Sequence, residues 1–162
     1  MKKIILVRHG KSSWEHNVSD EERPLKSRGK SDAKRVATHY ILNNSVPERI
    51  FSSSAKRALE TCKIFINRFK LSENSEIIVS DLYDFGGENV ISFIKKLPDN
   101  INEIMIFGHN HAFTSITNLY GDSSILNLPT AGLVKLKFEI DKWEELKQGT
   151  TELIIIPKEL KE

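Results

Sequence analysis

Near the start of the chain stands Ile4-Ile5-Leu6-Val7-Arg8-His9-Gly10, an apolar run that changes within one residue to two basic side chains and a glycine. The apolar part is continuous and rich in β-branched and aliphatic residues, which predicts a strand covered on both faces, as in a parallel sheet. Ligands of open α/β sheets bind just beyond the carboxyl ends of such strands. This stretch therefore predicts a buried strand over residues 4–7 and a site at Arg8 and His9.

The composition is typical of a globular protein, with 39% hydrophobic and 28% charged residues among 162. The net charge of +2 comes from 24 basic and 22 acidic residues spread along the chain, so no nucleic-acid-binding stripe stands out. The single cysteine, Cys62, rules out an internal disulfide, which suits a reducing compartment. No apolar run reaches the length of a signal peptide core or a membrane span. We therefore expect one cytoplasmic domain over residues 1–162 that binds neither nucleic acid nor membranes, and leave its oligomeric state open.

Apolar periodicity along the rest of the chain predicts strands that alternate with helices. The expected strands span residues 49–51, 76–79, 104–107, 133–140 and 153–156. The expected helices have apolar faces over residues 33–41, 55–69, 90–97 and 113–120. Apolar and charged residues alternate over 133–140, which predicts an antiparallel strand near an edge with one face in water. We expect a three-layer α/β/α sandwich with a mostly parallel central sheet, an antiparallel edge strand and right-handed crossovers.

Basic side chains follow three of these strands. Arg8 and His9 follow the first strand, and His109 follows the strand over 104–107. Arg57 lies in the first turn of the helix after the second strand, where the helix dipole favours a bound anion over a bare cation. Because the carboxyl ends of parallel strands lie at one edge of a sheet, these side chains can converge. Gathered cations repel one another unless an anion compensates, and guanidinium forks suit a phosphate, so the pattern predicts a phosphate pocket.

Histidine is the member of this group that can attack phosphorus and form a covalent intermediate, which water later breaks. The cations would then stabilise charge on the phosphoryl oxygens. The sequence has no glycine-rich loop of the Walker type, so a nucleotide phosphate cradle is not expected. Metal binding is the principal alternative, because His109-Asn110-His111 resembles half of a metallohydrolase motif, but no other His or Asp cluster supplies the remaining ligands. We therefore expect neither a cofactor nor a metal.

Three short motifs accompany the strand ends: Arg8-His9-Gly10, Ser54-x-x-Arg57-Ala58-x-x-Thr61 and Gly108-His109. They resemble the motifs of the histidine phosphatase superfamily, which includes phosphoglycerate mutases and acid phosphatases. Three longer stretches are similar to the small SixA-like phosphohistidine phosphatase branch, and the likeness spans nearly the whole chain: Arg8-His9-Gly10-Lys11-Ser12-Ser13-Trp14, Arg23-Pro24-Leu25-Lys26-Ser27-Arg28-Gly29 and Pro129-Thr130-Ala131-Gly132. The resemblance implies a phosphoglycerate mutase-like fold over residues 1–162. It also implies that His9 is the phosphorylated nucleophile and that Arg8, Arg57 and His109 hold the phosphoryl group.

Two features depart from the mutase-like members of that family. Those members have an asparagine a few residues after Arg-His-Gly, where this chain has Glu15. They also carry a glutamate general acid on a lid loop. The sequence shows no clear equivalent of this residue, and Asp84 and Glu88 are the candidates for it. Lys11 and Ser12 are additional candidates for contact with the substrate phosphate.

Together these features predict a phosphohydrolase that works through a phosphohistidine intermediate. The expected partner is a phosphorylated protein, carrying phosphohistidine, or a small phosphate ester. An alkyl ester expels an alkoxide that needs an acid, whereas phosphohistidine expels an imidazole that can take its proton from water. A site without a dedicated acid therefore favours phosphohistidine. The alternatives are a broad-specificity small-molecule phosphomonoesterase and a non-catalytic phosphate-binding module.

Overall fold

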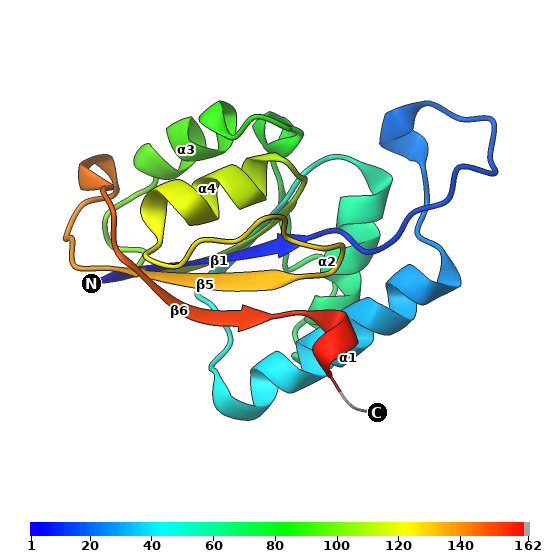
Figure 1. Ribbon diagram of the computed structural model, residues 1–162, viewed down its shortest axis with the longest axis horizontal. Coiled ribbons are helices and arrows are strands. Elements are labelled where there is room, and N and C mark those ends of the chain that lie inside the picture. Colours follow the sequence, from blue (N-terminus) through cyan, green and yellow to red (C-terminus); the bar gives the residue numbers. More distant parts are fainter. Residues whose placement is uncertain (161–162) are drawn as a thin grey trace.

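A six-stranded sheet forms the centre of the computed structural model, which describes residues 1–160 (Figure 1). The strand order is β3-β2-β4-β1-β5-β6. The strands are β1 (Lys2–Arg8), β2 (Arg49–Ser52), β3 (Ile77–Ile78), β4 (Glu103–Gly108), β5 (Leu133–Phe138) and β6 (Thr150–Ile155). The first four strands of this order pair in parallel, β5 is antiparallel to β1, and β6 is antiparallel to β5. The predicted α/β sandwich with a mostly parallel sheet is confirmed.

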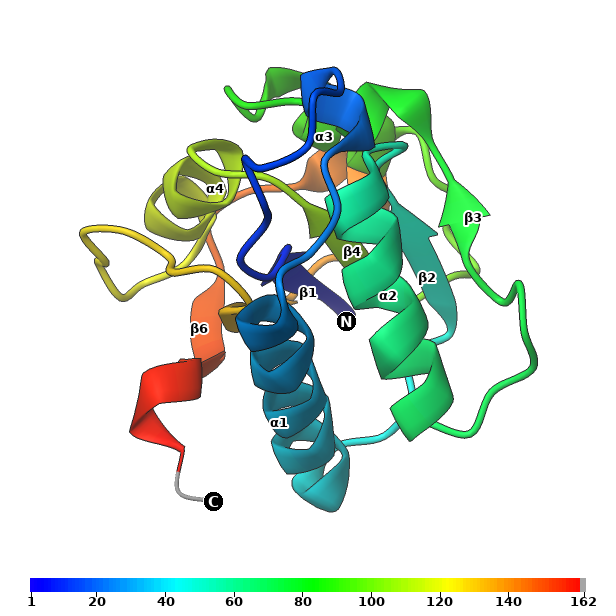
Figure 2. The same cartoon turned by 90° about the vertical axis from the view of Figure 1, so that its right-hand side faces the viewer.

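Helices cover both faces of the sheet. They are α1 (Ser27–Asn43), α2 (Lys56–Arg68), α3 (Glu88–Lys95) and α4 (Ala112–Tyr120). Short 3-10 turns are η1 (Asp20–Glu22), η2 (Ser80–Leu82), η3 (Trp143–Glu145) and η4 (Pro157–Glu159). Figure 2 shows α1 and α2 next to each other, and both pack on the same face of β1. Figure 1 shows α3 and α4 on the other side of the sheet from α1. No described helix is long and apolar enough to cross a membrane.

The strand β1 runs through the middle of this arrangement. Ile4 and Leu6 belong to the core cluster with α3 and α4, and Ile5 and Val7 belong to the cluster with α1 and α2. All four side chains are fully buried. A strand with neighbours on both sides and helices on both faces has no wet face, which explains why its sequence is a continuous apolar run.

The strand β5 differs from its prediction. It lies near the edge of the sheet, between β1 and β6, and is antiparallel to both, as predicted, but its Lys135 is only 3% exposed rather than in water. The Lys135 ammonium donates to Asn44 Oδ1 at 3.1 Å and lies 3.8 Å from Glu103 and 4.0 Å from Glu152. A buried charge is tolerated when it has such partners. Of the alternating charges in this stretch, Lys135 therefore belongs to a largely buried ion-pair network, whereas Lys137 and Glu139 are 35% and 76% exposed. The edge of the sheet is formed by β6.

The carboxyl ends of β1, β2 and β4 meet at one edge of the sheet. The register pairs Arg8 with Gly108 and Ser52 with Phe107. Two backbone hydrogen bonds continue this pairing beyond the strands, from His9 N to the Gly108 carbonyl at 3.1 Å and from Ser53 N to the Phe107 carbonyl at 2.9 Å. The residues that follow the three strands therefore lie side by side.

Candidate active site

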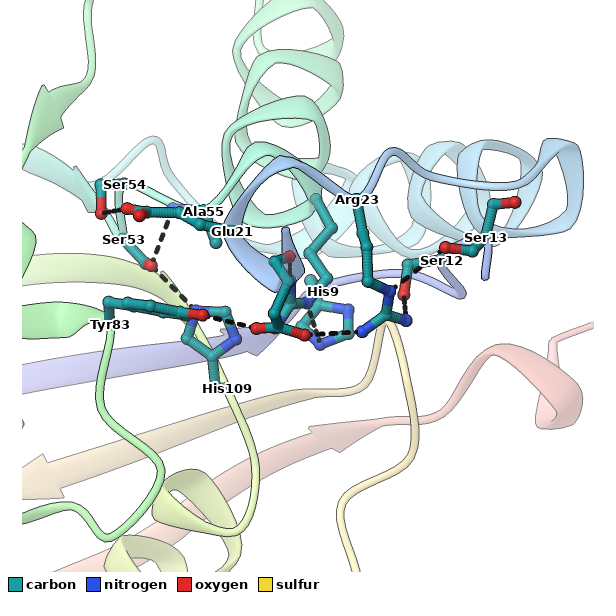
Figure 3. Close-up of polar contacts among 12 residues, drawn as sticks. His9, Ser12, Ser13, Glu21, Arg23, Ser53, Ser54, Ala55, Tyr83 and His109 are labelled. Carbon is teal, nitrogen blue, oxygen red and sulfur yellow. Dashed lines mark hydrogen bonds and ion pairs between the residues drawn. The ribbon is translucent and has the colours of Figure 1, made fainter. Parts of the chain in front are cut away.

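The strand ends bring the predicted site residues together (Figure 3). Arg57 Nε lies 3.4 Å from His9 Nε2, and the ring centroids of His9 and His109 are 5.4 Å apart. An open pocket of about 470 Å³ lies in front of His9, and Arg8, Arg57, Lys11 and Ser12 are among the residues that line it. His109 is completely buried behind this surface.

His9 is held in the form that suits a nucleophile. Its Nδ1 lies 2.7 Å from the Gly10 carbonyl, and because a carbonyl can only accept, Nδ1 carries the proton and Nε2 keeps its lone pair. Burial lowers the pKa of His9 to about 4, although the bond to Gly10 acts in the opposite direction, and the charges of Arg57 and Arg8 lower it further. His9 is therefore neutral at pH 7, with Nε2 available to attack an electrophile.

Two glycines let the loop after β1 pack directly on helix α1. A Cβ atom on Gly10 would lie 2.7 Å from the Gly29 carbonyl oxygen, and one on Gly29 would lie 2.2 Å from the Lys11 carbonyl oxygen. The backbone of Gly10 is also fixed from α2, because its N–H donates to Thr61 Oγ1 at 3.0 Å. The glycines at these two motif positions are thus explained by close backbone contacts around His9.

Arg57 is the second residue of α2 and is almost fully buried. Ala55 precedes the helix as its N-cap residue without a side-chain cap, whereas Ser54 Oγ donates to Glu21 Oε2 at 2.6 Å. Arg57 donates from Nη2 to Asp20 Oδ2 at 2.9 Å and from Nη1 to the Asp20 carbonyl at 2.6 Å. Its guanidinium group therefore bridges His9 and the loop before α1.

Two buried nitrogens of the site have no hydrogen-bond partner among residues 1–160. Arg8 donates from Nη1 to the Leu128 carbonyl at 2.7 Å, but its buried Nε is unpaired. His109 Nε2 lies 2.8 Å from Ser53 Oγ, while its buried Nδ1 is unpaired. Unsatisfied buried polar groups are rare in folded proteins and often serve a bound ligand.

His109 corrects one part of the sequence argument. Burial, followed by the charges of His9 and Arg57, lowers the pKa of His109 to about 3. His9 and His109 are therefore both neutral at pH 7, and they are not two of four gathered cations. The positive charge of the pocket comes from Arg8 and Arg57, to which the structure adds Arg23, and from Lys11 and Lys26, which also line the pocket.

The two buried histidines predict an acid-sensitive fold. Their pKa values are about 4 and 3 in the folded protein. In the unfolded chain the pKa of histidine is about 6.5. Below pH 6.5 the unfolded state therefore binds protons that the folded state does not bind, and the free energy of unfolding falls as the pH decreases to between 4 and 3. At pH 5 the difference amounts to about 2 kcal/mol for each histidine. Urea unfolding at pH 7.5 and 5.0 should therefore show a smaller acid loss for His109→Gln than for the wild type, and equal losses would contradict the prediction.

Three further residues of the site were missed by sequence reasoning: Asp20, Arg23 and Tyr83. Arg23 is buried and donates to Asp20 Oδ1 at 2.9 Å and to Ser12 Oγ at 2.5 Å, and its guanidinium group stacks 3.2 Å over the Trp14 ring. The Tyr83 hydroxyl donates to Asp20 Oδ2 at 2.5 Å. The Arg23 motif was visible as part of the family likeness, but no local pattern connects Asp20 or Tyr83 to His9.

The two candidate general acids have other surroundings. Asp84 accepts hydrogen bonds from the backbone N–H groups at the start of α3, namely those of Gly86, Gly87, Asn89 and Val90. Glu88 is exposed and lines a separate pocket between α3 and α4. Neither residue lines the pocket around His9. His111 is exposed at the N-cap of α4, and within the described part of the chain no three His, Cys, Asp or Glu side chains are grouped to hold a metal ion.

Known proteins resemble this chain in sequence and in fold. Residues 4–82 match the family model of the histidine phosphatase superfamily (branch 1). An uncharacterised chloroplastic protein of Arabidopsis thaliana is 29% identical over 155 residues, which cover 89% of this chain and 70% of that protein. The structure of the protein histidine phosphatase SixA complexed with tungstate has a TM-score of 0.82 at 18% identity, covering 98% of this chain and 99% of that one. Phosphoglycerate mutase from Thermus thermophilus has a TM-score of 0.64 at 16% identity, with coverages of 95% and 98%. These structural likenesses confirm the phosphoglycerate mutase-like fold.

Proposed function

We propose that this chain removes phosphate from phosphohistidine on a protein and that His9 carries the phosphoryl group in the intermediate. The match of residues 4–82 to the family model of the histidine phosphatase superfamily supports this proposal. The observation that carries the proposal is the state of His9. Its Nδ1–H is bound to the Gly10 carbonyl, its Nε2 keeps a lone pair, and Arg57 lies beside that nitrogen. A neutral imidazole next to a guanidinium group is suited to attack a phosphoryl group.

The reaction then has two displacements at phosphorus. In the first, His9 Nε2 forms a bond to phosphorus while the bond to the leaving group breaks and its electron pair departs with that group. In the second, a water oxygen bonds to phosphorus, the P–N bond breaks, its electron pair returns to Nε2, and a proton passes to solvent. The donors that could stabilise the phosphoryl oxygens are the arginine groups. The unpaired Nδ1 of His109 is a further donor in the tautomer in which Nδ1 carries the proton and Ser53 Oγ donates to Nε2.

The proposed substrate depends on whether a carboxylic acid of the site can protonate the leaving group. Among the described residues that line the pocket, Asp20 is the one with a carboxylate. Burial alone would raise the pKa of Asp20, but hydrogen bonds from Tyr83, Arg57 and Arg23 outweigh it and hold that pKa well below its usual range. Asp20 is therefore ionised at pH 7 and has no proton to give to an alkoxide. An imidazole leaving group does not need that proton from the enzyme.

The mouth of the pocket also suits a ring next to the phosphate. Trp14 and Phe85 both line the pocket, and they are 75% and 46% exposed. Exposed aromatic side chains beside a polar pocket are available to stack on a flat group such as imidazole. This supports a substrate whose phosphate is attached to an aromatic ring presented at a protein surface.

Substrate preference is the test of this function. We expect kcat/KM for a phosphohistidine peptide to exceed that for a phosphoserine peptide or 3-phosphoglycerate by about 10²-fold or more, the usual contribution of a general acid. Aryl phosphates should fall between the two. Release of inorganic phosphate, measured with EDTA present, gives these values directly. Asp84→Asn and Glu88→Gln serve as controls that should change phosphohistidine turnover little.

Each competing function predicts a different result in this assay. Preferential hydrolysis of alkyl esters, or loss of phosphohistidine turnover in either control variant, would indicate a phosphomonoesterase that uses a general acid. Saturable phosphate binding without release of phosphate from any substrate would indicate a non-catalytic binding module.

A further inference from the structure

The carboxylate of Asp20 lies at the point where three donors of the pocket converge. Arg57 Nη2 and the Tyr83 hydroxyl donate to its Oδ2 at 2.9 and 2.5 Å, and Arg23 Nη1 donates to its Oδ1 at 2.9 Å. Figure 3 shows Tyr83 and Arg23 on opposite sides of His9, with a dashed line leading inward from each. The donors come from three separate segments: helix α2, the residue after η2, and the residue after η1. The tertiary structure thus builds a binding site for an oxyanion and fills it with a side chain of the protein itself.

The donors are fixed, whereas the anion that they hold faces solvent. The side chains of Arg57 and Arg23 are 3% and 9% exposed, but that of Asp20 is 42% exposed. Arg57 also donates to the backbone carbonyl of Asp20. Rotation of the Asp20 side chain would therefore release three donors while the backbone contact with Arg57 stays in place.

The position of Asp20 on Arg57 overlaps with the position that a phosphoryl group needs. Arg57 Nε faces His9 Nε2, and Nη2, on the same edge of the guanidinium group, faces Asp20 Oδ2. Through Nε and Nη2 together, an arginine side chain can donate a pair of hydrogen bonds to a phosphoryl group. A phosphoryl group bonded to His9 Nε2 would need both nitrogens, and one of them is already bonded to Asp20.

We propose that Asp20 is an internal anion that occupies the oxyanion site of the pocket in the free protein, and that substrate phosphate displaces it from Arg57, Arg23 and Tyr83. This inference rests on the proposed function only in assigning the site to a phosphoryl group. Asp20 lowers the affinity for phosphate, because the incoming dianion must replace a like charge. The same competition helps to expel product phosphate after the second displacement.

Binding of inorganic phosphate to Asp20→Asn tests the inference. The asparagine keeps the shape of the side chain but removes its charge, so we expect the Kd for inorganic phosphate, measured by titration calorimetry, to fall by about tenfold. The KM for a phosphohistidine peptide should fall with it. Glu22→Gln is the matched control, because it removes the same charge from another position of the same 3-10 turn and should leave the Kd unchanged.

Two results would overturn the inference. Weaker or unchanged phosphate binding in Asp20→Asn would show that Asp20 only holds Arg57 in place. A collapse of kcat with accumulation of phosphorylated enzyme and an unchanged Kd would show that Asp20 activates the hydrolytic water instead. Asp20→Ala gives a second measurement if Asp20→Asn does not fold.

The binding experiment needs no turnover, so it is independent of the proposed function. Tighter phosphate binding by Asp20→Asn in a protein that hydrolyses no substrate would refute the proposed function and support the internal anion.

Discussion

His9→Ala should hydrolyse no phosphorylated substrate at a measurable rate, with kcat/KM lowered by about 10⁵-fold or more, the scale seen when a covalent nucleophile is removed. Alanine has no lone pair to bond to phosphorus. His109 cannot take over, because it is completely buried and its Nε2 lies against Ser53 Oγ. The measurement is release of inorganic phosphate from a phosphohistidine peptide and from an aryl phosphate.

Covalent labelling provides a second readout for the same variant. Brief incubation with a phosphorylated substrate should leave acid-labile, alkali-stable phosphate on the wild type and none on His9→Ala. His39→Ala is a suitable control, because His39 is exposed on α1, outside the pocket around His9. Stoichiometric labelling of His9→Ala would refute the role assigned to His9.

Arg57→Ala should lower kcat by about 10²–10³-fold, the loss expected when a donor to transition-state charge is removed. The expectation rests on the contact between Arg57 Nε and His9 Nε2, which places the guanidinium group beside the bond that forms to phosphorus. The effect should appear mainly in kcat, because charge on the phosphoryl oxygens develops in the transition state. Initial rates over a range of substrate concentrations separate kcat from KM.

A lysine at position 57 distinguishes charge from geometry. Arg57→Lys keeps the positive charge but loses the fork of N–H groups, so its kcat should stay closer to that of Arg57→Ala than to that of the wild type. Arg68→Ala is the control, because Arg68 is exposed in the last turn of the same helix. Full activity in Arg57→Lys, or a change confined to KM, would show that Arg57 only attracts the substrate.

The site divides into a rigid part and an exposed part. His9 and His109 follow strands β1 and β4 at the centre of the sheet. The backbone N–H of His9 donates to the Gly108 carbonyl, and the His109 side chain lies against Ser53 Oγ after β2. The loop between β1 and α1, which extends away from the sheet in Figure 1, instead contributes Trp14 and Asp20. The side chains of both residues are exposed. A buried nucleophile beside an exposed loop suits a reaction in which one phosphoryl group is held while different partners enter and leave.

Local patterns in the amino-acid sequence predict most of the strands and helices and the convergence of Arg8, His9, Arg57 and His109 at one edge of the sheet, whereas the catalytic roles of these four residues stay predictions. The apolar runs at 4–7 and 104–107 are buried strands, and the basic residues after them converge as predicted. This was possible because burial and strand direction leave a local pattern: a strand covered on both faces must be continuously apolar, and parallel strands must end at one edge.

The tertiary structure alone decided the charge state of the site and the partners of its arginines. His9 and His109 are neutral because they are buried, which no neighbouring residue in the sequence indicates. Asp20 reaches Arg57 and Tyr83 only because packing brings three segments together, and a contact between distant segments leaves no periodic signal. Lys135 is mispredicted for the same reason. Its charge in an alternating stretch predicts a solvent-exposed face, but packing buries it beside Glu103 and Glu152, which belong to two other strands.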